Sequence, residues 1–205
     1  MSPLPTPTWS PPPGTQGLIF DCDGTLADTM PVHFVAWTAM LREHGIGFAE
    51  ATFYAMGGMP SERIIRQLAH EQQVAVGDVS AMVDDKESRF LAMIDRVRPV
   101  ARVVAVAAAH RGRLPMAVAS GGEGRIVRRT LAVIGVDDWF DAVVGAEDTE
   151  RHKPEPDVFF EAARRIGAEP TACVVFEDTE MGLEAGRRAG MHTVDVRPWY
   201  LPRTR

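Results

Sequence analysis

The chain has 205 residues, of which 45% are hydrophobic and 24% charged, a composition typical of a protein that folds around a sizeable core. Its net charge of −6 at pH 7, without a long basic block, argues against nucleic acid or an anionic membrane surface as a partner. No apolar stretch is long enough to cross a bilayer, and the first residues do not resemble a signal peptide, so we expect a cytoplasmic protein.

Residues 1–16 are rich in proline and lack hydrophobic periodicity, so we predict a flexible tail without a catalytic role. From Gly17 onward, short apolar runs alternate with helical stretches, which predicts a doubly wound parallel α/β sheet. The predicted strands are 18–20, 116–119, 142–145, 173–176 and 193–196. Cys22 and Cys173 fall in or beside such runs, where we expect buried thiols and no disulfide.

The first two strands are separated by an insertion of roughly seventy residues, too long for one crossover and helical in pattern. Apolar residues repeat at helical spacing in three stretches: Val32, Val35, Ala36, Ala39 and Met40; Ile64, Ile65, Leu68 and Ala69; Phe90, Leu91, Met93 and Ile94. We therefore predict that residues 30–97 form a helical cap domain. The cap is inserted into a core of residues 17–29 and 98–205.

Two carboxylates, Asp21 and Asp23, follow the first predicted strand, and Gly24 and Thr25 complete a turn with backbone donors and a hydroxyl. Such a run is also common in surface turns. Three further polar segments follow strands at the same end of the sheet, where doubly wound proteins bind ligands. The combination favours a site for a metal and a phosphate.

The second of these segments ends a strand at Ser120, where Gly121 and Gly122 leave N–H groups open to an oxyanion, although Ser-Gly-Gly is also an ordinary turn. The third contains Lys153 between a histidine and proline-restricted residues. A lysine held there can offset negative charge on a phosphate and on Asp21.

The fourth segment places Glu177 and Asp178 after the strand at 173–176. Either Asp178 or Thr179 could cap the next helix, but capping by one acid leaves the other unexplained. A carboxylate that approaches a phosphate dianion meets a repulsion on the order of 8 kcal/mol at about 4 Å with an effective dielectric near ~20, so cations are needed. Hard oxygen ligands favour Mg²⁺.

In this order, Asp21-Cys-Asp23-Gly-Thr25, Ser120, Lys153-Pro and Glu177-Asp178 resemble the four motifs of the haloacid dehalogenase superfamily. The resemblance covers essentially all of the chain after the tail. The inserted helical cap resembles the β-phosphoglucomutase-like subgroup, and segments 28–37 and 174–190 resemble its fructose-1-phosphate phosphatase-like members. This likeness implies that residues 17–29 and 98–205 form the catalytic core and that the cap of residues 30–97 selects the substrate.

This resemblance implies that Asp21 is a nucleophile that forms an aspartyl phosphate and that Asp23 transfers protons. It also implies that Asp21, the backbone carbonyl of Asp23 and Asp178 hold Mg²⁺, with Glu177 as a ligand or as an acid beside the ligands. The groups that would bind the transferred phosphoryl are Thr25, Ser120 and the backbone at Gly121.

Two cap residues, His33 and Lys86, fall where the mutase subgroup has a His and a Lys that contact substrate or control the proton-transferring Asp. Each has a simpler interpretation: His33 packs at the start of a helix, and Lys86 lies in an acidic surface segment. Ser61 falls where the mutases have an Arg for the remote phosphate of a sugar bisphosphate, which counts against a mutase.

The predicted function is therefore a Mg²⁺-dependent phosphatase of a small phosphorylated sugar or sugar acid, such as fructose-1-phosphate or 6-phosphogluconate. One alternative is a β-phosphoglucomutase-like mutase. Another is a non-enzymatic, receiver-like phospho-acceptor domain, although a receiver has its phosphorylated Asp after a later strand and needs no helical insertion. The expected partner is the small substrate, with neither nucleic acid nor membrane, and we expect a monomer or weak oligomer.

Overall fold

The computed structural model describes residue 5 and residues 9–200, and the chain divides into two compact units. Residues up to Asp28 and from Arg98 onward form one unit, and Thr29–Val97 form the other. The second unit begins one residue before the predicted cap and ends with it. A role of this unit in substrate selection stays a prediction.

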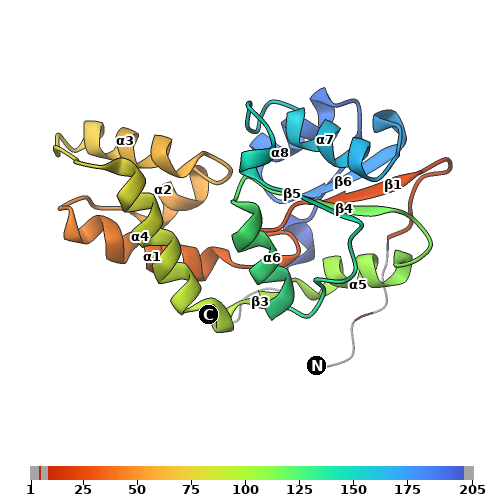
Figure 1. The fold of residues 1–205 in the computed structure, drawn as a ribbon, viewed down its shortest axis with the longest axis horizontal. Coiled ribbons are helices and arrows are strands. Elements are labelled where there is room, and N and C mark those ends of the chain that lie inside the picture. Colours follow the sequence, from red (N-terminus) through yellow and green to blue (C-terminus); the bar gives the residue numbers. More distant parts are fainter. Residues whose placement is uncertain (1–4, 6–8, 201–205) are drawn as a thin grey trace. The chain divides into compact units, whose positions relative to one another are not determined.

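Five parallel strands form the sheet of the first unit, in the order β5-β4-β1-β6-β7 (Figure 1). They are β1 (Gly17–Phe20), β4 (Met116–Ala119), β5 (Ala142–Val144), β6 (Cys173–Glu177) and β7 (His192–Asp195). Phe20 is in register with Val118 of β4 and with Phe176 of β6. The carboxyl ends of these three neighbouring strands therefore meet at one edge of the sheet, and the predicted doubly wound α/β fold is confirmed.

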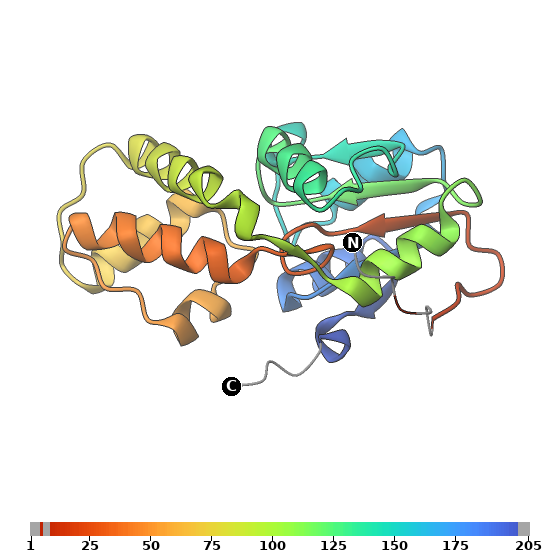
Figure 2. The same cartoon turned by 90° about the horizontal axis from the view of Figure 1, so that it is seen from below.

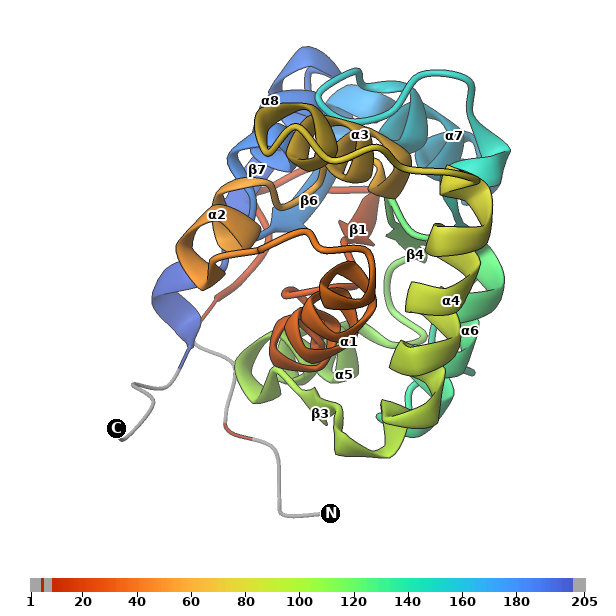
Figure 3. The same cartoon turned by 90° about the vertical axis from the view of Figure 1, so that its left-hand side faces the viewer.

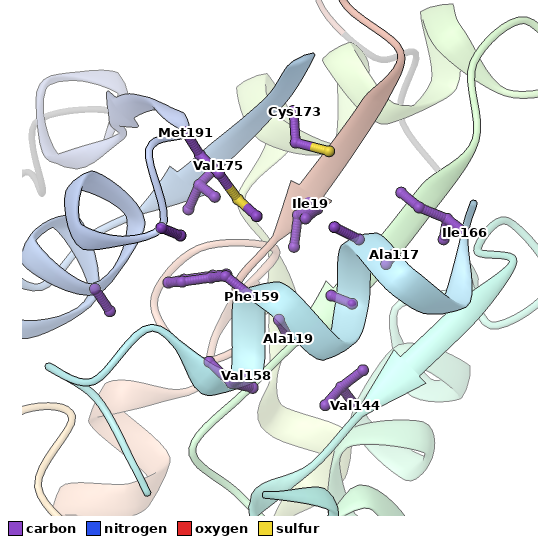
Figure 4. Close-up of a cluster of buried hydrophobic side chains, with 14 residues drawn as sticks. Ile19, Ala117, Ala119, Val144, Val158, Phe159, Ile166, Cys173, Val175 and Met191 are labelled. Carbon is purple, nitrogen blue, oxygen red and sulfur yellow. The ribbon is translucent and has the colours of Figure 1, made fainter. Parts of the chain in front are cut away.

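Helices cover both faces of this sheet. On one face lie α7 (Asp157–Arg165) and α8 (Glu180–Arg188), and on the other lie α5 (Ala101–His110) and α6 (Gly124–Val133) (Figure 1 and Figure 3). Every residue of β1, β4 and β6 is buried, which explains why these strands are continuous apolar runs. In Figure 4 the side chain of Phe159 from α7 packs among residues of these strands, including Ile19, Ala119 and Val175.

A two-stranded antiparallel sheet lies where the chain passes from one unit to the other: β2 (Ala27–Asp28) pairs with β3 (Arg98–Pro99). The described residues of the first unit also form the 3-10 turns η2 (Ala146–Asp148), η3 (Pro170–Ala172) and η4 (Arg197–Trp199). The pairing of β2 with β3 brings together the chain segments that enter and leave the second unit.

The second unit consists of helices: α1 (Met30–Glu43), α2 (Glu50–Ala55), α3 (Ser61–Glu71), α4 (Val79–Ala92) and the turn η1 (Ile94–Arg96). Helix α1 runs beside α4 (Figure 2). Helix α4 begins where the Asp78 carboxylate accepts hydrogen bonds from the N–H groups of Ser80 and Ala81. The apolar side chains of this unit form their own core.

The predicted apolar faces of these helices are partly correct. The four apolar residues predicted for α3 are all buried. In α1 the prediction for Val35 is wrong, because its side chain is 46% exposed and the buried stripe runs instead through Ala36, Trp37 and Met40. Leu91 and Met93 are also only partly buried, since α4 ends at Ala92 and the chain changes direction there.

The described part of the proline-rich segment is in contact with the first unit. The Trp9 ring packs edge-on against Phe176, with ring centroids 4.8 Å apart, and the Gln16 N–H donates to the Ala172 carbonyl at 2.8 Å. Residues 1–4 and 6–8 of the predicted tail lie outside the described residues.

Among the residues that the structure does describe, no helix combines the length and apolarity needed to cross a membrane. Cys22 and Cys173 are both buried and unbridged.

Candidate active site

Three of the predicted acidic residues meet at the carboxyl edge of the sheet. Asp21 directly follows β1, Glu177 is the last residue of β6, and Asp178 comes next. One carboxylate oxygen of each lies within 4.8 Å of the others. Asp21 and Glu177 are almost completely buried. This geometry follows from the register of β1 with β6, which places the two strand ends side by side.

Lys153 joins this acidic cluster from the loop before α7. Its ammonium donates to Asp21 Oδ1 at 2.8 Å, to Glu177 Oε1 at 2.7 Å and to the Ala119 carbonyl at 3.3 Å. The ammonium therefore uses three donors in a buried position. Burial opposes its charge, but the two carboxylates outweigh burial and hold the pKa of Lys153 above its ordinary range.

The negative charge of the cluster exceeds the positive charge that Lys153 provides. Burial raises the pKa of Asp21 to about 7 even though Lys153 acts to lower it. Burial, together with the charges of Asp21 and Glu177, raises the pKa of Asp178 to about 9. A set of buried carboxylate oxygens with this excess charge fits a small, hard divalent cation.

The turn after β1 packs directly on Asp178. Gly24 has a positive φ of 83°, and a Cβ at this position would overlap the Asp178 carboxylate. The Thr25 hydroxyl donates to Asp178 Oδ1 at 3.2 Å and is fully buried. Only glycine combines this backbone conformation with so close an approach. The predicted phosphate-binding Thr25 thus lies beside the acidic cluster.

The Ser120 segment forms the next part of the same edge. The buried Ser120 hydroxyl accepts a hydrogen bond from the Gly122 N–H at 3.0 Å, whereas the position of a Cβ at Gly121 is open. A Cβ at Gly122 would lie 3.4 Å from Ser120 Oγ and 3.5 Å from Asp23 Oδ2. The carboxylate of Asp23 and the hydroxyl of Ser120 are therefore on the same side of the turn.

The helix cap that the sequence left open between Asp178 and Thr179 is made by Thr179. Its hydroxyl accepts from the Gly182 N–H at 3.0 Å and donates to Glu177 Oε2 at 2.9 Å. Glu177 thus has Lys153 on one oxygen and Thr179 on the other. Because Thr179 caps α8, the Asp178 side chain can face Asp21.

We predict that Gly182→Ala impairs both folding and activity, because a Cβ at this position would overlap the Glu177 carboxylate, whose neighbours are fixed by hydrogen bonds. The expected loss of unfolding free energy is about 1–3 kcal/mol, measured by urea denaturation. Gly77→Ala is the matched control, because a Cβ there meets nothing within 4 Å. Equal stability of the two variants would contradict the prediction.

His33 and Lys86 belong to the other unit, and each has partners there. The His33 ring stacks on Phe90, with centroids 3.8 Å apart. Lys86 is buried rather than in a surface segment: its ammonium donates to Glu87 at 2.6 Å and lies 5.3 Å from the centroid of the Trp37 ring. The interpretation of Lys86 as part of an acidic surface segment is therefore wrong.

Three contacts at this edge of the sheet have no signal in the sequence. The Ala119 carbonyl accepts from Lys153, the Val196 N–H donates to the Glu177 carbonyl at 2.9 Å, and the Tyr200 hydroxyl donates to the Gly24 carbonyl. The last contact joins residues that are 176 positions apart. No local sequence pattern predicts this contact, because the two residues are far apart in the chain and belong to no common motif.

The fold and this edge of the sheet define a haloacid dehalogenase-like hydrolase, and the model of that family matches residues 15–190. The chain belongs to this family, as the motifs predicted, and is an enzyme of the phosphomonoesterase class. The receiver-like alternative is thereby set aside.

Among its relatives, the fructose-1-phosphate phosphatase YqaB of Escherichia coli (strain K12) is 42% identical over 88% of this chain and 96% of its own length. The hexitol phosphatase A of the same organism is 27% identical over 88% of this chain and 82% of its own length. Among solved structures, a β-phosphoglucomutase from Clostridium difficile superposes with a TM-score of 0.79 at 20% identity, over 88% of this chain and 84% of its own. The structural likeness supports the fold, and the sequence relatives support the hydrolase family.

Proposed function

We propose that the chain is a Mg²⁺-dependent phosphatase that hydrolyses a small phosphorylated sugar through a phosphate ester of Asp21. The observation that carries this proposal is the buried contact of 2.8 Å between Asp21 and Lys153, at the strand edge where Asp178 also lies. The ammonium favours the charged form of the Asp21 carboxylate, and in that form the carboxylate can act as a nucleophile.

In the proposed reaction, an oxygen of Asp21 bonds to phosphorus while the bond from phosphorus to the sugar oxygen breaks. Asp23 gives its proton to the departing alkoxide and then takes a proton from the water that attacks the phosphorylated Asp21. Inorganic phosphate leaves and both carboxyl groups return to their first state. The position of the Asp23 carboxylate beside Gly122 and Ser120 supports this role.

The residues that would hold Mg²⁺ are Asp21, Asp178 and the backbone carbonyl of Asp23. When bound, Mg²⁺ neutralises charge on the phosphoryl oxygens and lowers their repulsion from Asp21. Glu177 already accepts hydrogen bonds on both oxygens, which favours a role in holding Lys153 and Thr179 beside the ligands. Thr25, Ser120 and the N–H of Gly121 would bind the transferred phosphoryl group.

We predict that Mg²⁺ raises the melting temperature and that this rise grows as the pH is increased from about 6 to about 9. Burial raises the pKa of Asp21 to about 7 and of Asp178 to about 9, so the metal-free fold binds more protons than the unfolded chain over this range. Its stability therefore falls as the pH rises. Mg²⁺ binds the deprotonated carboxylates, so its affinity and its stabilising effect increase as the pH rises.

The measurement is thermal unfolding with EDTA or Mg²⁺ across this pH series. Asp178→Asn should remove most of the Mg²⁺ effect, whereas Asp137→Asn, at an exposed position, should keep it. A Mg²⁺-induced rise that stays constant with pH would contradict the assignment of the cluster as the metal site.

A sugar phosphate is the proposed substrate because the 42%-identical relative is named as a fructose-1-phosphate phosphatase and another relative as a hexitol phosphatase. His33 and Lys86 would contribute substrate contacts from the cap. Their present partners, Phe90 and Glu87, fix the orientation of both side chains, which is compatible with that role.

The test is release of phosphate from a panel that includes fructose-1-phosphate, hexitol phosphates and 6-phosphogluconate, with Mg²⁺ and with EDTA. Conversion of β-glucose-1-phosphate in the presence of glucose bisphosphate is assayed in parallel. We expect Mg²⁺-dependent hydrolysis of at least one sugar phosphate. Efficient isomerisation without hydrolysis would replace the phosphatase by the mutase, and inactivity on the whole panel would contradict the proposed substrate class.

A further inference from the structure

The segment 196–200, which we call the C-terminal clamp, contacts the end of β6 and the turn that follows β1. The Val196 N–H donates to the Glu177 carbonyl at 2.9 Å, and the Trp199 ring lies 6.0 Å, centroid to centroid, from the ring of Phe176. At the end of the clamp, the Tyr200 hydroxyl donates to the Gly24 carbonyl. The family match ends at residue 190, so the clamp lies beyond it.

The peptide groups around Gly24 form the turn that follows β1. Its N–H donates to the Ala27 carbonyl at 2.8 Å, and the Cys22 carbonyl accepts from the N–H groups of Thr25 and Leu26. These hydrogen bonds are local to the turn, whereas the Tyr200 hydroxyl donates to the Gly24 carbonyl from a distant part of the chain. Because Gly24 packs against the Asp178 carboxylate, a rotation of its peptide group would move the turn relative to Asp178.

The clamp is anchored independently of the Tyr200 hydroxyl. Arg197 pairs with Asp195 and with Glu180, each at 2.6 Å, and Trp199 packs on Phe176. Removal of the hydroxyl alone should therefore leave the clamp in place, and its effect reports on the Gly24 turn.

We propose that Tyr200 is a positioning residue that holds the turn of Asp21–Thr25 against Asp178. The carboxylates of Asp21 and Asp178 then keep the separation that a metal requires. This inference rests on the proposed function, because it assigns Tyr200 to the same site. Tyr200 acts through the Gly24 carbonyl and does not touch the reacting atoms.

The test compares Tyr200→Phe with Tyr54→Phe, which removes the same hydroxyl from the other tyrosine of the chain, exposed on α2. For Tyr200→Phe we expect kcat to fall roughly 3- to 10-fold, the range expected for one lost hydrogen bond, with KM little changed. The Mg²⁺-induced rise in melting temperature should shrink, while the metal-free melting temperature stays within about 4 °C of wild type. Tyr54→Phe should match wild type in all three measurements.

An unchanged kcat or an unchanged Mg²⁺-induced rise in Tyr200→Phe would overturn the proposal. A lower metal-free melting temperature with a normal Mg²⁺ response would assign the hydroxyl to stability alone and would also overturn it. If the wild-type protein hydrolyses no sugar phosphate, the proposed substrate class fails. The Mg²⁺-induced rise still decides the role of Tyr200 in that case, because it needs no substrate.

Discussion

Asp21→Asn should lower phosphate release by at least about 10⁴-fold, because an amide cannot replace the carboxylate that bonds to phosphorus. Asparagine has nearly the same shape as aspartate, so the contact with Lys153 and the packing of the strand end should survive. The measurement is single-turnover and steady-state phosphate release in the presence of Mg²⁺, supported by circular dichroism to verify the fold.

Asp137→Asn is the matched control, because it makes the same chemical change at an exposed position outside the site. We expect this control to keep wild-type activity. Substantial turnover by purified Asp21→Asn would exclude Asp21 as the nucleophile. A loss of activity that is equal in both variants would instead indicate a general effect on the protein.

Lys153→Met should both abolish activity and destabilise the fold. The substitution leaves Asp21 and Glu177 buried without the ammonium that both contact, and breaking a buried ion pair from one side costs about 3–5 kcal/mol. Urea denaturation of the metal-free protein measures this cost. The loss should be larger at high pH, because the carboxylates can bind protons at low pH and so avoid an uncompensated charge.

Arg111→Met provides the comparison for this second substitution. Arg111 pairs with Asp138 at 2.6 Å, but both side chains are largely exposed, so the expected change in unfolding free energy is about 0–1 kcal/mol. If Lys153→Met cost no more than Arg111→Met, Lys153 would not be the ammonium that balances the buried carboxylates. Retained activity in Lys153→Met would remove it from the proposed mechanism.

The two substitutions probe opposite charges in one electrostatic arrangement. Asp21, Glu177 and Asp178 supply more negative charge than Lys153 can balance, and a phosphate would add more. The proposed function depends on a second cation that restores the balance during attack on phosphorus. The pH dependence of Mg²⁺ stabilisation and the effect of Tyr200→Phe test this arrangement without relying on catalysis.

Much of the core unit was predictable because its signals are local. Each inner strand of the sheet is an apolar run that ends at a polar residue: Asp21 after β1, Ser120 after β4 and Asp178 after β6. In a parallel sheet such ends lie on one edge, so the order of the motifs along the chain was enough to predict which residues would meet. The helices of the second unit were also recognisable from their periodicity, as the four buried residues of α3 demonstrate.

The predicted buried face of a helix was wrong where several of its positions were equally apolar. In α1 both Val35 and Ala36 suit a buried face, but the contacts of the folded unit bury Ala36 and leave Val35 exposed. The environment of Lys86 was also misjudged, because neighbouring acids along the chain suggested a solvated surface. The fold instead buries the ammonium between Glu87 and the ring of Trp37.

The amino-acid sequence alone was sufficient for the α/β class, the inserted helices, the family and the residues gathered at the strand ends, since periodicity and motif order are properties of neighbouring positions. Only the tertiary structure shows that Thr179, and not Asp178, caps the helix. It also places Lys153 and Thr179 around Glu177 and brings Tyr200 to Gly24. These choices depend on side-chain directions and on contacts between residues far apart in the chain. Such contacts exist only after the strands have aligned, which is why no local pattern encodes them.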